Sequence, residues 1–135
     1  MEAALRELVW EQARGRCEYC RLHQEDADFQ TFHVEHIIAE QHGGGDEPDN
    51  LCLACPQCNL AKGPNLSGYL DGRIVPLFHL RRQSWDRHFE WHGPVLVGKT
   101  QSGRATVRVL NINDSGRMAV RQSLIEEGRF PPEDD

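Results

Sequence analysis

Two pairs of cysteines restrict the fold of this chain more than any other feature. Within each pair two residues separate the thiols, Cys17 from Cys20 and Cys55 from Cys58. Such a gap lets both thiolates of one turn reach the same ion, and two turns complete a tetrahedron around zinc. Four thiolates leave no position for water, so the spacing predicts a structural zinc. A redox-active pair, which needs only one of the two motifs, and buried free thiols are the alternatives.

A fifth cysteine, Cys52, has the same spacing to Cys55 and complicates the assignment. Residues 50–54 form an apolar segment ahead of the second pair, which favours Cys55 and Cys58 as ligands and Cys52 as a small buried residue. The N-terminus lacks the basic, apolar and small-residue order of a secretory leader, so we expect a cytoplasmic protein whose cysteines bind metal instead of forming disulfides.

The length and composition fit one globular domain over residues 1–135. The apolar share is 39% of 135 residues, which is ordinary for a globular protein. No window approaches the roughly 18 to 20 continuous apolar residues of a membrane span, so we expect no membrane partner.

The net charge of −6 hides a separation of charge along the chain. Residues 22–51 contain eight acidic residues and no Lys or Arg, whereas residues 62–121 contain ten basic and four acidic residues. Phosphate affinity depends on local Lys and Arg, so the second half can present a basic face to nucleic acid. An ordinary solvated surface explains any single one of these charges equally well.

Periodicity and breaker residues predict the order of elements. Residues 2–14 form an amphipathic helix closed by Gly15, 30–35 form a strand, and 37–39 start the return strand. A loop covers 43–50, and a helix begins at Pro56 and ends at Gly63. The later elements are a strand at 73–78, a helix at 84–91, a β pair of 95–97 with 105–110, and a helix from Asn113 or Asp114 to Gly128.

One stretch combines several chemically distinct residue types in a fixed order. It contains Glu35-His36-Ile37-Ile38, then Asn50-Leu51, then Cys55-Pro-Gln-Cys58-Asn59-Leu-Ala-Lys62-Gly63. Together with Cys17-Glu-Tyr-Cys20 it resembles the HNH endonuclease family, in the variant with four zinc-binding cysteines, over roughly residues 14–65. The resemblance implies an α+β fold with a ββα-metal core in residues 1–65. An N-terminal helix and a C-terminal β pair plus helix flank the core, with 66–128 packed on it and 129–135 as a tail.

The residues suit phosphodiester hydrolysis. Imidazole titrates near neutrality, so His36 can take a proton from water. A Mg²⁺ or Mn²⁺ ion prefers oxygen ligands, which Glu35 and the side-chain carbonyl of Asn59 can supply. By resemblance, His36 is the general base, Asn50 holds the loop and orients the histidine, and Glu35 and Asn59 bind the metal. His33 shares a strand face with Glu35 and is a candidate third ligand.

Four further residues are candidates for nucleic-acid contact: Lys62, Arg81, Arg82 and His42. Lys62 can instead stabilise the end of its helix, and His42 can be an ordinary loop histidine. The first hypothesis is therefore a metal-dependent endonuclease acting on DNA. The alternatives are a non-catalytic nucleic-acid-binding zinc module and a structural zinc protein with a protein partner. The pattern does not distinguish DNA from RNA or define a recognition sequence, a biological role or an oligomeric state.

Overall fold

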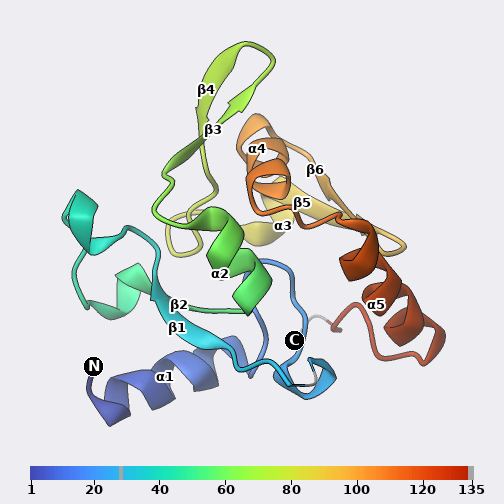
Figure 1. Cartoon of the computed structure of the whole chain (residues 1–135), viewed down its shortest axis with the longest axis horizontal. Coiled ribbons are helices and arrows are strands. Elements are labelled where there is room, and N and C mark those ends of the chain that lie inside the picture. The colour runs from blue at the N-terminus through green and yellow to red at the C-terminus, as the bar shows by residue number, and fades with distance from the viewer. Residues whose placement is uncertain (28, 134–135) are drawn as a thin grey trace.

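The computed structural model describes residues 1–27 and 29–133 (Figure 1). Asp28, one of the acidic residues counted above, and the last two residues of the expected tail lie outside the described residues. The helices are α1 (Ala3–Ala13), α2 (Pro56–Lys62), α3 (Trp85–His88), α4 (Gln101–Val109) and α5 (Ser115–Glu126). The strands are β1 (His33–His36), β2 (Leu51–Ala54), β3 (Ser67–Leu70), β4 (Arg73–Pro76), β5 (Phe89–His92) and β6 (Val95–Gly98).

The N-terminal half consists of a β hairpin between two helices. Figure 1 shows β1 and β2 lying between α1 and α2. The strands pair antiparallel, with His33 opposite Ala54 and His36 opposite Leu51. All four residues of β2 are buried, and α1 contacts both strands. This is the ββα arrangement that the sequence predicts, with the expected helices at α1 and α2.

The return strand lies further along the chain than we expected. Residues 37–39 do not pair with β1, and the partner is β2, which follows a loop and a short 3-10 helix at Pro48–Asn50. The apolar run at 37–39 has the composition of a strand. However, Ile37 N–H bonds to the carbonyl of Asn50 at 2.8 Å, and Gly44 comes so close to the Ile38 carbonyl that a Cβ there would stand 1.7 Å from its oxygen. Residues 37–39 therefore belong to a tight loop, and the strand that pairs with β1 begins only after this loop.

The C-terminal half differs from the expectation in two of its elements. Of residues 105–110, expected as a strand, the first five belong to helix α4 and Leu110 is its C-cap; the N-cap Thr100 accepts a hydrogen bond from Gly103 N–H at 3.0 Å. Strand β6 pairs instead with β5, which occupies the second part of the helix expected at 84–91. The alternation of apolar residues in 105–110 fits a strand, but Gly103 and Thr106 are buried one helical turn apart. The final helix was correctly predicted, with Asp114 as its N-cap.

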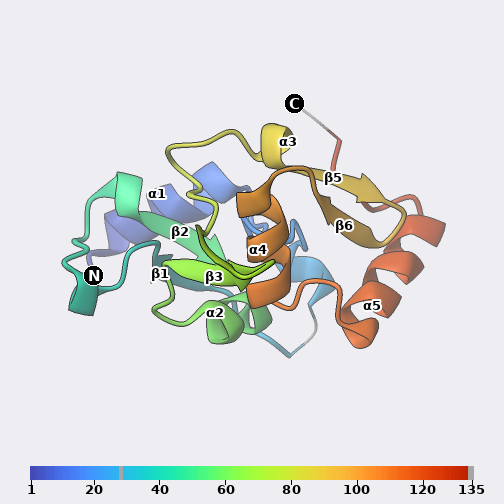
Figure 2. The same ribbon diagram turned by 90° about the horizontal axis from the view of Figure 1, so that it is seen from above.

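The two halves share one apolar core. Buried residues from the hairpin, such as Leu51 and Leu53, belong to the same cluster as Phe78, Leu96 and Leu110 from the second half. Figure 2 shows α4 beside the β3–β4 hairpin, which α4 also contacts. In the described part of the chain, no helix is long and apolar enough to cross a membrane.

Candidate metal centre and active site

The four paired cysteines come together as the sequence predicts. Their sulfur atoms all lie within 4.8 Å of one another, and all four residues are buried. Cys17 and Cys20 lie in the turn after α1, which closes through Cys17 N–H to the Leu22 carbonyl at 2.8 Å. Cys55 is the N-cap of α2 and Cys58 lies in its first turn. These residues are close enough to bind a zinc ion, and all five cysteines are free of disulfides.

Cys52 stands apart from this group. It lies on β2 opposite Glu35 and is not one of the four clustered thiols. Burial, reinforced by the negative charge of Glu18, raises the pKa of the Cys52 thiol to about 12. Because its sulfur lies outside the group of four, Cys52 is not a candidate ligand of that site. It is therefore a small buried core residue.

Two candidate ligands for a catalytic metal lie side by side between β1 and α2. The side chain of Asn59 donates a hydrogen bond from Nδ2 to Oε1 of Glu35 at 3.1 Å. Asn59 follows Cys58 directly, so a zinc ion held by the four cysteines would fix the helix that carries it. Both side chains are half-buried, and their oxygens suit a hard cation such as Mg²⁺ or Mn²⁺.

His36 is the last residue of β1 and lies at the opening of the loop that follows. Its Nε2 contacts Oδ1 of Asp46 at 2.7 Å, and Oε1 of Glu40 lies 3.8 Å away. His36 is half-buried, whereas the two carboxylates are exposed. These three side chains form a second group with ligand atoms within 4.8 Å of one another. A cation bound there would take the place of the contact between Nε2 and Asp46 and would leave Nδ1 of the ring uncoordinated.

Asn50 holds that loop in place, as the resemblance implies. Its side chain is buried and uses both ends: Oδ1 accepts from Ile38 N–H at 2.9 Å, and Nδ2 donates to the carbonyls of Ile38 and Gly45 at 3.0 and 2.9 Å. Gly45 directly precedes Asp46, the residue that contacts His36. Asn50 therefore controls the position of the histidine's partner without touching the histidine itself.

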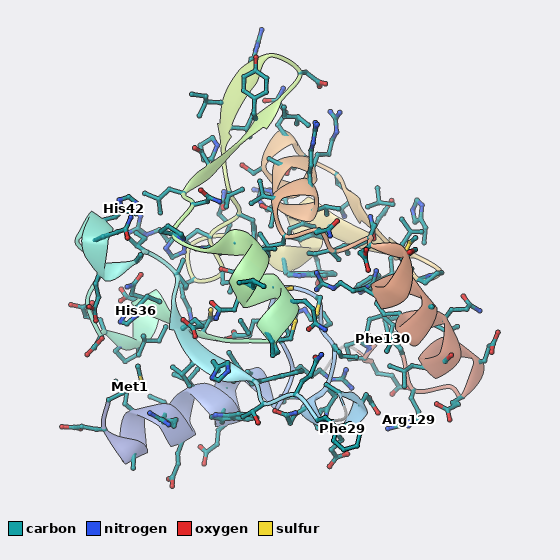
Figure 3. All side chains as sticks on the ribbon, viewed as in Figure 1. Met1, Phe29, His36, His42, Arg129 and Phe130 are labelled. Carbon is teal, nitrogen blue, oxygen red and sulfur yellow. The ribbon has the colours of Figure 1, made fainter. Side chains whose placement is uncertain are left out.

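The other expected site residues have different surroundings. Lys62 is buried and donates from Nζ to the Ile37 carbonyl at 2.8 Å, and Arg81 pairs with Glu18, so both are engaged inside the protein. Arg82 is exposed. His42 is exposed in a short 3-10 helix at Glu40–His42, on the same side of the molecule as His36 in Figure 3. His33 begins β1 and is exposed, and among the described residues no hydrogen bond joins it to Glu35 or Asn59.

The sequence reasoning missed several residues of the two sites. Asp46 and Glu40 were counted only as acidic charge, although both lie within ten residues of His36. Arg117 and Arg121 were counted as basic charge, yet Arg117 donates to a cysteine of the zinc group at 2.8 Å. Their separation by four residues on a predicted helix is the one signal that places them on a common face.

This arrangement of a ββα hairpin and four clustered cysteines is that of an HNH domain with a candidate zinc site. The family model for HNH endonuclease matches residues 17–65. An HNH domain implies a nuclease-type function.

A more particular likeness comes from a whole-chain comparison. The chain is 26% identical over 117 residues to the Septu protein PtuB of Bacillus thuringiensis. The match covers 85% of this chain but 43% of the relative, so the chain spans less than half of that protein's length. No solved structure matches the chain.

Proposed function

We propose that this protein is a metal-dependent endonuclease that hydrolyses phosphodiester bonds of DNA, with His36 as the general base. The observation that carries the proposal is the contact between Glu35 and Asn59, because it brings together two side chains whose oxygens can bind a divalent metal. From the likeness to PtuB, we also propose that the chain works in a Septu system. We expect a cytoplasmic location, which would keep its five cysteines reduced.

The residues of this chain divide the work of the reaction. Glu35 and Asn59 would hold Mg²⁺ or Mn²⁺, which supplies a Lewis acid for the phosphate and leaving oxygens. An ionised carboxylate only accepts hydrogen bonds, so the contact with Asp46 places the imidazole proton on Nε2. The neutral ring then has Nδ1 available to accept a proton from the attacking water.

The nucleic-acid surface follows from which basic residues are exposed. Lys62 and Arg81 are engaged in internal contacts, so we do not include them among the DNA contacts. Arg82, which lies next to Arg81 in sequence, and His42, in the loop after His36, are exposed. We propose these two side chains as phosphate contacts, and binding through them should weaken as salt rises.

The decisive experiment is plasmid nicking by zinc-loaded protein in Mg²⁺, Mn²⁺ or EDTA. We expect nicking with either metal, none in EDTA, and none for His36→Ala. The control is His92→Ala, which removes an exposed histidine of β5 and should nick at the wild-type rate. Zinc content and circular dichroism confirm that each variant is folded.

The alternative outcomes separate the competing hypotheses. Salt-dependent DNA binding without nicking by any variant would favour the non-catalytic binding module. Neither binding nor nicking would favour a structural zinc protein with a protein partner. Equal nicking by wild type and His36→Ala would exclude His36 as the base.

A further inference from the structure

Two arginines of α5 face the cysteine cluster. Arg117 donates from Nη2 to the sulfur of Cys58 at 2.8 Å, and the same nitrogen lies 3.9 Å from the sulfur of Cys55. Arg121 is one turn further along the helix, on the same face, and is 2% exposed. A cavity of about 280 Å³ is lined by both arginines together with Cys20 and Cys55. Two cationic side chains from the C-terminal end of the chain thus border the centre formed by its N-terminal half.

Neither arginine has a carboxylate partner among residues 1–27 and 29–133. Arg117 gives its other donors to the carbonyls of Leu110 and Asn111 at 2.8 and 3.1 Å. Arg121 donates to the carbonyls of Pro94 and Ile112, both at 2.8 Å. Carbonyl groups satisfy hydrogen bonds but supply no net negative charge. Burying a cation without a counter-charge is costly, so an anionic group nearby would stabilise the buried Arg121, which otherwise packs on the Trp91 ring, and the half-buried Arg117.

Asp26, the carboxylate that lines the same cavity, already has a different cationic partner. It forms an ion pair with Arg129, from the segment that follows α5. Among the described residues that line this cavity, the remaining source of negative charge is the cysteine cluster. Four protonated thiols would be neutral and would leave both guanidinium groups uncompensated. Zinc with four thiolates carries a net charge of about −2, which two arginines balance.

We propose that Arg117 and Arg121 form the outer shell of the zinc centre and balance its charge, so that α5 packs firmly only on the metal-loaded cluster. The proposal extends the zinc site from four ligands in the first half of the chain to two cations in the second. Hydrogen bonds and counter-charges around a metal are known to control its retention, and losing one typically costs 10- to 100-fold in affinity. The end of the protein furthest in sequence from the cysteines therefore contributes to holding the metal.

The test measures zinc release to a chromogenic chelator from the zinc-loaded full chain. We expect Arg117→Gln, which removes the charge and shortens the side chain, to release zinc about 10-fold faster than wild type. Arg117→Lys keeps the charge but lacks the planar guanidinium with its several N–H donors, so its rate of zinc release should be intermediate. Arg108→Gln on α4 is the control: it removes an exposed arginine that does not line the cavity, so it should release zinc at the wild-type rate.

Hydrogen–deuterium exchange of the zinc-loaded proteins locates the effect. In Arg117→Gln, faster exchange should be confined to residues 115–126, with α1 protected as in wild type. The proposal would be overturned if Arg117→Gln and Arg108→Gln had the same rates of zinc release and of hydrogen exchange. If Arg117→Gln does not fold, Arg117→Lys carries the test, and a wild-type release rate in that variant would overturn it. Neither readout depends on nuclease activity, so a failed nicking assay has no bearing on this result.

Discussion

Glu18 and Arg81 form a two-pronged ion pair that joins the two halves of the protein. The guanidinium donates to both carboxylate oxygens, at 2.7 and 2.9 Å, and both side chains are largely buried. Glu18 lies between two cysteines of the zinc group and also accepts from Leu53 N–H at 2.8 Å. Arg81 donates to the Leu51 carbonyl at 2.8 Å. The pair therefore connects the first zinc turn, strand β2 and the loop before α3.

Arg81→Ala should destabilise the protein strongly, because it leaves the Glu18 carboxylate buried without its counter-charge. The expected loss in the free energy of unfolding is roughly 3 to 5 kcal/mol, measured by urea denaturation of zinc-loaded protein. Arg82→Ala, which removes the neighbouring exposed arginine, should change it by less than about 0.5 kcal/mol. Equal stability of the two variants would show that the ion pair does not hold the halves together.

Asn50→Asp tests the role of the buried asparagine with almost no change in shape. The substitution replaces the Nδ2 donor with an oxygen that faces the carbonyls of Ile38 and Gly45. The loop carrying Asp46 should shift, and a displacement near 1 Å at a catalytic group costs about 100-fold in rate. We expect nicking to fall by that factor while zinc content stays at the wild-type level. An unchanged rate would mean that this loop does not position His36.

Asp46→Asn tests the contact between Asp46 and His36. An amide can present either an acceptor or a donor to Nε2, so the variant no longer enforces a proton there. Since Asp46 is exposed, we expect a moderate loss of about tenfold in the nicking rate. Asp49→Asn, a change of the same type in the same loop, is the control and should retain activity. A faster Asp46→Asn enzyme would instead indicate that Asp46 blocks the histidine.

Removing single cysteines checks which thiols bind zinc. Cys52→Ala should keep one zinc per chain, because Cys52 is not one of the four clustered thiols. A small cavity should lower the free energy of unfolding by about 1 kcal/mol. Cys58→Ala should lose zinc and most of the fold. Zinc content by atomic emission distinguishes the two, and loss of zinc from Cys52→Ala would contradict the assignment.

His88 makes stability depend on pH. Burial, with a smaller effect of Arg87, lowers the pKa of His88 below its ordinary 6.5. Its Nδ1 lies 2.6 Å from Oγ1 of Thr100, the N-cap of α4. Below pH 6.5, His88 therefore binds a proton more readily in the unfolded chain than in the native protein. The stability from neutral His88 is present above that pH and is lost as pH falls below it.

The measurement compares unfolding free energies at pH 7.5 and 5.5, with zinc content checked at both values. His88→Asn keeps an acceptor near Thr100 but cannot titrate, so its stability should fall less between the two pH values than that of wild type. Parallel falls in both proteins would assign the pH dependence to other groups, such as the cysteine thiolates.

Local sequence patterns were sufficient to predict some parts of the fold and not others. The cysteine spacing correctly predicted the four-thiol cluster, because a two-residue gap has few geometries that satisfy a common ion. The strand at 105–110 was wrong because short apolar alternation fits a strand and a helix face alike, and the Thr100 cap decided in favour of a helix. Residue type alone also failed to separate Arg82, which is exposed, from Arg81, which is buried against Glu18.

By itself the sequence determined the four-cysteine cluster and the helices α1 and α2, because each depends on spacing within short segments. Only the tertiary structure decided which charges meet. Glu18 and Arg81 are 63 residues apart, and Arg117 and Cys58 are 59 apart. Contacts at such separations depend on how the second half packs on the first, and no periodicity in the chain encodes that. The physical reason is that the role of a charged side chain depends on its burial and on its partners, and both are established only when the chain folds.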